Sequence, residues 1–104
     1  MIRARYGRRS LSLDLRGHAQ YGPKGKDIVC AAASALAFTA AAALQDESER
    51  FYPRVVEQPG ALRIACEPAE GSRRACRRLL DTIWIGFELL AQQFPEYVSA
   101  EKEE

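Results

Sequence analysis

The sequence lacks an excess of charge of either sign, because 15 lysines and arginines nearly balance 14 acidic residues in a chain of 104. Domains that bind nucleic acid usually carry a strong basic excess, so direct nucleic-acid binding is not favoured. The chain also has a single histidine and three cysteines that form no close C-x-x-C pair. This is too few ligands, too widely spaced, for a typical metal site, and we expect neither a metal nor another cofactor. The odd number of cysteines is atypical of a small secreted domain and indicates a cytoplasmic protein.

Long, strongly apolar runs are also missing. The arginines near the N-terminus are followed by alternating residues and not by the apolar segment of a signal peptide. The most apolar segment, residues 28–44, is dominated by alanine and contains Ser34 and Thr39. It therefore falls short of the roughly 20 strongly apolar residues that a membrane span needs, and we expect no association with a membrane.

Two kinds of periodicity indicate the secondary structure. Segments in which every second residue is apolar predict strands, and segments with apolar residues every three or four positions predict helices. The predicted order is β-β-α-β-β-α, with strands at 2–6, 11–15, 52–57 and 61–66 and helices at 27–45 and 73–94. We expect one α+β domain over residues 1–104, in which the sheet packs against both helices in two layers. Phe38 should add bulk to the buried side of the first helix, and residues 100–104 should form a frayed acidic tail.

The start of the first predicted helix is the best candidate for chemistry. Asp27 is a good N-cap, which places Cys30 in the first helical turn, where backbone N–H groups lack partners within the helix. The helix dipole and these amides stabilise a thiolate, the reactive form of cysteine. The N–H groups of Ile28 and Val29 are then candidates to bind an oxyanion.

The only histidine lies at the other end of the loop that precedes this helix. His18 begins a segment, 17–26, that contains Gly17, Gly22 and Gly25 and is predicted to be flexible. A loop that folds back would place an imidazole beside the Cys30 thiol, giving a base and a nucleophile. The alternative is that Cys30 is a small buried residue and His18 an ordinary surface residue. Cys66 and Cys76 lie on apolar stripes with no base nearby, so we expect both to be structural.

The segment from Gly17 to Leu36 resembles the signature of the ribosomal-processing cysteine protease family, Prp. The shared features are a Gly-His-Ala start at 17–19, a glycine-containing loop, Asp-Ile-Val-Cys-Ala-Ala at 27–32 and Ser-Ala-Leu at 34–36. The resemblance implies that Cys30 is the catalytic nucleophile and His18 the base. Asp27 and Ser34 also match family positions: Asp27 either orients His18 or caps the helix, and Ser34 either contacts substrate or bonds back to the helix. Ala33 departs from the family, where a larger β-branched residue is expected.

The resemblance further implies an activity and its partners. Family members are expected to remove a short N-terminal extension from the bacterial large-subunit ribosomal protein twenty-seven, cleaving after phenylalanine, and to form homodimers. The partner of this chain would then be the N-terminal peptide of a ribosomal protein precursor. A module that binds RNA or the ribosome without cleaving peptides remains the alternative, with the arginines at 3–9 and 73–78 contacting phosphates. Its weakness is that the predicted strands offer few aromatic side chains on which bases could stack.

Overall fold

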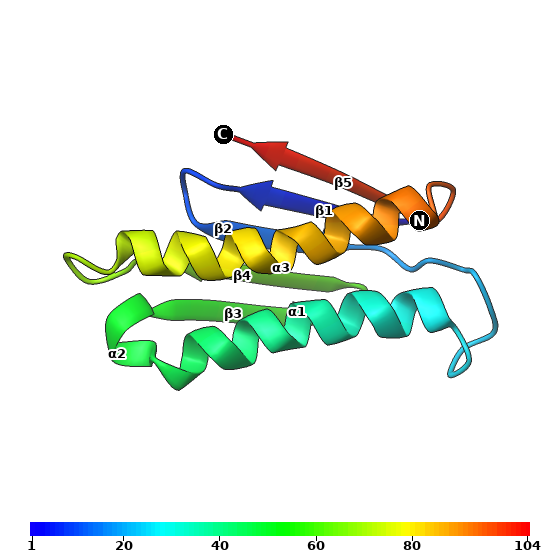
Figure 1. The fold of residues 1–104 in the computed structure, drawn as a ribbon. Helices are drawn as coiled ribbons and strands as arrows, with labels where there is room; N and C mark the ends of the chain where they lie inside the picture. Colours follow the sequence, from blue (N-terminus) through cyan, green and yellow to red (C-terminus); the bar gives the residue numbers. More distant parts are fainter.

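The computed structural model describes all residues 1–104 and contains one five-stranded sheet with the helices on one of its faces (Figure 1). The order of strands across the sheet is β3-β4-β2-β1-β5. Only β5 runs parallel to its neighbour, so the sheet is mixed. The elements are β1 (Ile2–Gly7), β2 (Ser12–Arg16), α1 (Ile28–Asp46), α2 (Ser48–Phe51), β3 (Pro53–Gln58), β4 (Ala61–Cys66), α3 (Arg73–Gln93) and β5 (Val98–Glu103).

Alternation along the strands decides which face of the sheet is covered. In β1, Ile2, Ala4 and Tyr6 are buried beneath the helices, whereas Arg3 and Arg5 lie on the exposed face. Successive side chains of a strand point to opposite faces, so this pattern fixes one apolar and one solvated face. The predicted α+β class and the two-layer packing of a sheet against two helices are confirmed.

Small residues bring the two long helices together above the sheet. The buried face of α1 consists mainly of alanines, among them Ala33, Ala37 and Ala40. On α3, Gly86 faces Leu36 of α1 so closely that an added Cβ would overlap the Leu36 side chain. Close packing of this kind tolerates little displacement. It therefore holds α1, and with it the position of Cys30, relative to the sheet.

The C-terminal residues correct one expectation. Residues 100–104 were predicted to fray, but β5 extends to Glu103 and pairs with β1 from Ile2↔Val98 to Gly7↔Glu103. Backbone pairing does not require apolar side chains, and without β5 the N–H and C=O groups along this edge of β1 would have no partners in the sheet. Val98 is buried, and an ion pair between Arg5 and Glu103 joins the two strands on the exposed face.

Helix α1 is long and apolar enough to cross a membrane if length and composition alone are considered. Core helices of soluble proteins meet the same criteria. In this fold the residues of one α1 face, from Val29 to Leu44, are buried in the common core. Phe38 is different from the prediction: it is 48% exposed and lies outside that core.

Candidate active site

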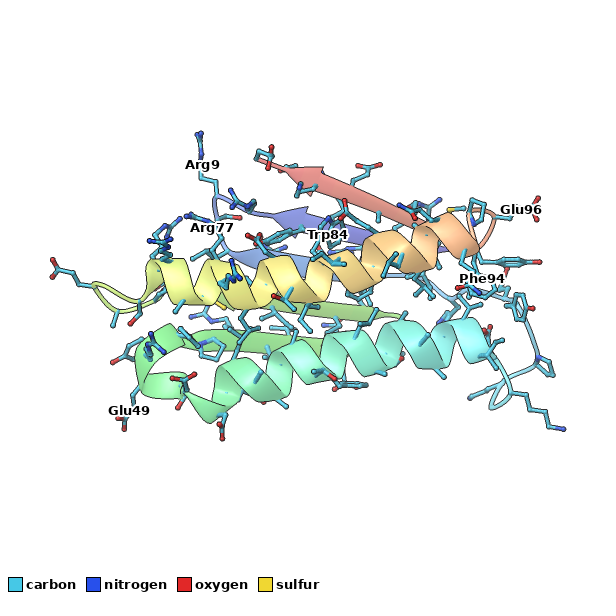
Figure 2. The ribbon with its side chains drawn as sticks, viewed as in Figure 1. Arg9, Glu49, Arg77, Trp84, Phe94 and Glu96 are labelled. Atoms are coloured by element: carbon cyan, nitrogen blue, oxygen red, sulfur yellow. The ribbon has the colours of Figure 1, made fainter.

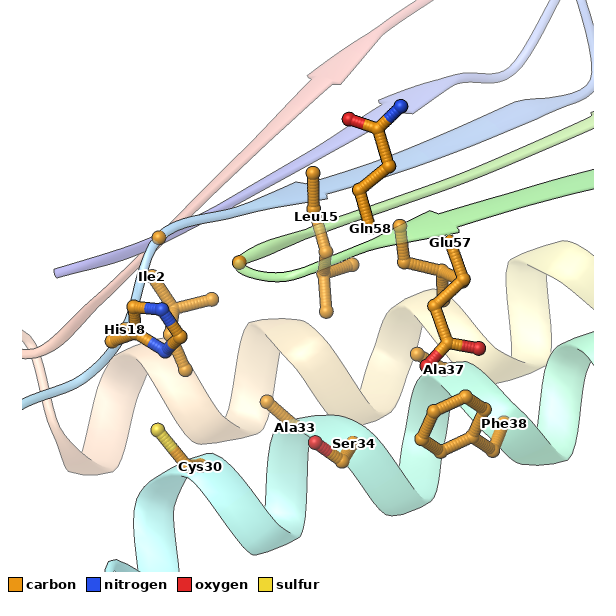
Figure 3. A pocket seen from close by; sticks show the side chains of 14 residues that line it. Ile2, Leu15, His18, Cys30, Ala33, Ser34, Ala37, Phe38, Glu57 and Gln58 are labelled. Atoms are coloured by element: carbon orange, nitrogen blue, oxygen red, sulfur yellow. The ribbon is translucent and has the colours of Figure 1, made fainter. Parts of the chain in front are cut away.

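Cys30 and His18 lie on facing walls of one cleft (Figure 3). The cleft has a volume of about 190 Å³ and separates the N-terminal half of α1 from the β3–β4 hairpin. Cys30 is half-buried in the first turn of α1, and its sulfur points toward the imidazole of His18 on the opposite wall. The two side chains form no hydrogen bond with each other, and the cleft between them is open. A small movement of the loop that carries His18 would therefore change their separation.

The backbone around His18 is held by two glycines. Gly17 has φ +92°, and a Cβ at this position would overlap the carbonyl oxygen of Met1. Its N–H donates to the carbonyl of Gly60 at 2.8 Å, which ties the residue before His18 to the β3–β4 turn. Gly60 itself has φ +72°, and a Cβ there would lie 3.0 Å from Nε2 of His18. The imidazole thus packs directly against a turn that only glycine forms without strain.

A backbone amide is directed at the Cys30 sulfur. The N–H of Ala19 donates to Sγ at 3.3 Å, and Ala19 is only 2% exposed. In general, an N–H donor with little access to water stabilises a negatively charged sulfur more strongly than it stabilises a neutral thiol. Ala19 directly follows His18, so the same short segment presents the imidazole and this donor to Cys30. Sequence reasoning did not identify Ala19, because a backbone donor leaves no residue-type signal.

Asp27 caps α1 and anchors the loop. Its Oδ1 accepts hydrogen bonds from the N–H groups of Val29 and Cys30, both at 3.0 Å. Its Oδ2 accepts from the N–H of Tyr21, also at 3.0 Å. The backbone donors, that of Cys30 above all and then that of Tyr21, lower the pKa of the Asp27 carboxyl group. The carboxylate makes no hydrogen bond with His18.

This cap corrects the prediction for the oxyanion site. The N–H groups of Ile28 and Val29 were expected to be free for a substrate oxygen, but Asp27 engages that of Val29, together with that of Cys30. The reason is that a good N-cap satisfies the same amides that an anion would use. Of the two residues predicted as oxyanion donors, only Ile28 keeps an amide that Asp27 does not engage.

The loop between His18 and Cys30 is anchored near its middle. The ring of Tyr21 packs edge-on against Phe94 and Tyr97, with centroid distances of 5.4 and 5.1 Å. Gly25 has φ +85° and no atom within 4 Å of where its Cβ would be, so it occupies open space at the tip. Gly22, in contrast, lies close to the backbone of residues 26 and 27. The flexibility predicted for this segment would thus centre on the part beyond Tyr21.

The cleft continues along α1 away from Cys30. Ser34 lies one helical turn further on, and Phe38 lies one turn beyond Ser34 (Figure 3). Leu15 and Leu62 contribute apolar side chains from the sheet. An elongated, largely apolar groove that starts at a thiol has the form needed to bind an extended chain beside a nucleophile.

The other two cysteines lie outside the cleft. Cys66 and Cys76 are buried in the core between β4 and α3. Contact with the Cys76 thiol, together with burial, raises the pKa of the Cys66 thiol, so that it stays protonated near neutral pH. Neither sulfur is placed to react with a peptide.

Comparisons with known proteins identify relatives of the whole chain. The family model described as cysteine protease Prp matches residues 1–99. The structure is similar, with a TM-score of 0.80 and 20% identity, to an essential ribosomal processing protease Prp from S. aureus bound to a covalently linked product peptide. That match covers 98% of this chain and 97% of the other. SMU.848 from Streptococcus mutans is 29% identical with a TM-score of 0.73, over 98% of this chain and 93% of that one. A comparison with curated protein sequences finds none that matches.

Proposed function

Because the chain belongs to the cysteine protease Prp family, we propose that Cys30 is its catalytic nucleophile and His18 the general base. The observation that carries the proposal is the shared cleft: the only histidine of the chain faces the one cysteine that is not buried in the core. Such a pair is the minimum that nucleophilic catalysis by a thiol requires. The Ala19 N–H supports the same assignment, because it donates a hydrogen bond to the sulfur that would attack the substrate.

The geometry supports a two-stage mechanism. Cys30 Sγ attacks the scissile carbonyl carbon while His18 holds the thiol proton, and His18 then donates that proton to the departing amine. The carbonyl carbon remains attached to sulfur as a thioester. Water attacks the thioester after His18 removes its proton, and the thiolate leaves as the new carboxyl group forms. Asp27 positions Cys30 through the helix cap, and Ser34 lies where its hydroxyl would contact the bound peptide.

The proposed substrate is the precursor of large-subunit ribosomal protein twenty-seven, cleaved after phenylalanine in the cytoplasm. The relative from S. aureus is a ribosomal processing protease. Another of its structures, which has a TM-score of 0.73 and 19% identity to this chain, holds a substrate peptide. In this chain, the apolar groove beside Cys30, with Leu15 and Leu62 in its wall, suits an aromatic residue next to the cleaved bond.

We also infer that the chain forms a homodimer and needs neither a cofactor nor a nucleic acid. Ile85 and Leu89 lie one turn apart on the outer side of α3 and are 56% and 59% exposed. An exposed apolar pair on a long helix favours contact with a second copy. Measurement of the molar mass in solution, for the wild-type chain and an Ile85→Glu/Leu89→Glu variant, checks this inference.

The experiment that tests the proposed function is cleavage of the precursor. We expect the wild-type chain to shorten the host's ribosomal protein precursor at one bond after phenylalanine, as measured by the mass of the product. Cys30→Ser and His18→Ala should each abolish or nearly abolish this cleavage while the far-ultraviolet circular dichroism stays unchanged. Cys66→Ala, which removes a thiol outside the cleft, is the control and should cleave normally. Full activity of Cys30→Ser would contradict the proposal.

A further inference from the structure

Glu57 is an exposed carboxylate in the wall of the cleft that holds Cys30. It is the next-to-last residue of β3 and lies opposite Leu62 in the pairing with β4. Figure 3 shows its side chain directed toward α1, with the carboxylate above the Phe38 ring, whereas the neighbouring Gln58 points away from α1. Glu57 therefore lines the same cleft as Cys30, at the opposite end from His18.

No basic side chain of the protein neutralises Glu57. It takes part in none of the ion pairs of the structure, and α1, the helix it faces, contains no lysine or arginine. The other residues of β3 that share its face, Pro53 and Val55, are half-buried, whereas Glu57, near the end of the strand, is exposed. An exposed carboxylate that has no basic partner on the protein is free to pair with a positive charge on a bound ligand. For Glu57, such a positive charge would come from a ligand bound in the cleft.

The distance from Cys30 limits which part of a peptide reaches Glu57. Phe38, beneath the carboxylate, follows Cys30 by about two helical turns, or about 12 Å along the helix axis. An extended peptide advances about 3.3 Å per residue, so three to four residues span this distance. A peptide side chain three or four residues from the cleaved bond would therefore contact the Glu57 carboxylate.

We propose that Glu57 is a specificity-determining residue that binds a lysine or arginine located three or four residues from the scissile bond of the peptide substrate. This inference rests on the proposed function, and it adds a charge requirement to it. The preferred substrate thus combines an apolar residue at the cleaved bond with a basic residue near one end of the bound segment. The ion pair lies at the edge of the cleft and is partly solvated, so it selects among peptides more than it tightens binding.

The test uses a set of peptides with one cleavable phenylalanyl bond and a single lysine moved from two to six residues away, on each side. For the wild-type chain we expect kcat/KM to peak with lysine three or four residues away on one side, about fivefold above a glutamine peptide. Glu57→Gln should remove the peak, and Glu57→Lys should instead prefer a glutamate at that position. Glu101→Gln, which makes the same change in net charge on the exposed face of the sheet, is the matched control and should keep the peak.

Each outcome bears on the inference. A peak that disappears in Glu57→Gln, reverses in Glu57→Lys and weakens with added salt supports it. A flat profile, a peak that survives Glu57→Gln, or an equal loss for all peptides would overturn the inference and leave the proposed function standing. Failure of the wild-type chain to cleave any peptide would overturn the proposed function and this inference with it.

Discussion

Single residues of this site act mainly through the backbone next to them. His18 is held by Gly17 and Gly60, and the Cys30 sulfur receives the amide of Ala19. Of these, His18 and Cys30 are the residues that the sequence predicts as the catalytic pair, from their residue types and the specific motif around them. The sequence did not point to Ala19, Gly60 or Glu57, since their positions at the cleft arise from contacts between segments that the fold brings together.

Gly60 gives a prediction at this scale. Gly60→Ala should lower kcat/KM at least tenfold, because its Cβ would lie 3.0 Å from His18 Nε2 and would displace the imidazole from its position facing Cys30. The positive φ of this residue should also cost about 1–2 kcal/mol of unfolding free energy. Steady-state cleavage and thermal unfolding measure the two effects.

Gly71→Ala separates the two effects of that substitution. Gly71 also has a positive φ, +85°, but has no atom within 4 Å of where its Cβ would be. We expect a similar loss of stability and nearly normal turnover. If Gly71→Ala and Gly60→Ala impaired turnover equally, backbone strain would explain the defect and the contact with His18 would not.

Among the elements, the two long helices and the first four strands follow from apolar periodicity, but α2 and β5 do not. The sequence of β5 is largely charged, and only Val98 is deeply buried. The strand forms because β1 offers an open edge, which is a property of the assembled sheet and not of the segment. For the same reason the Asp27 cap was predictable from the local sequence, whereas its bond to Tyr21 required knowledge of the loop path.

Asp27 gives a prediction about pH. Its pKa is lowered in the folded state, so its contribution to stability is fully present above the pKa of the unfolded chain, near 3.9, and is lost as the pH falls through the folded value. Asp27→Asn keeps one side-chain oxygen for the helix cap but has no second oxygen for the Tyr21 N–H. We expect its melting temperature to lie below that of the wild type at pH 7, and the gap to close below about pH 4. A gap of equal size at pH 3 and pH 7 would contradict this account of the cap.

At the scale of the whole molecule, the fold brings together two ends of a loop that the sequence separates. The close α1–α3 packing fixes Cys30, and the β3–β4 turn fixes His18, so the cleft between them depends on the complete two-layer structure. The same architecture buries Cys66 and Cys76. One thiol therefore lines the cleft and faces an imidazole, while the other two are buried.

The most direct test of this account is the labelling of the cysteines with a peptide chloromethyl ketone that ends in phenylalanine, followed by mass spectrometry. We predict one adduct, on Cys30, that forms at neutral pH at least tenfold faster than any adduct on Cys66 or Cys76. His18→Ala should slow the labelling of Cys30 by about tenfold or more, because the base that activates the thiol is removed. Labelling of Cys66 or Cys76 first, or an unchanged rate at Cys30 in His18→Ala, would contradict the central claim.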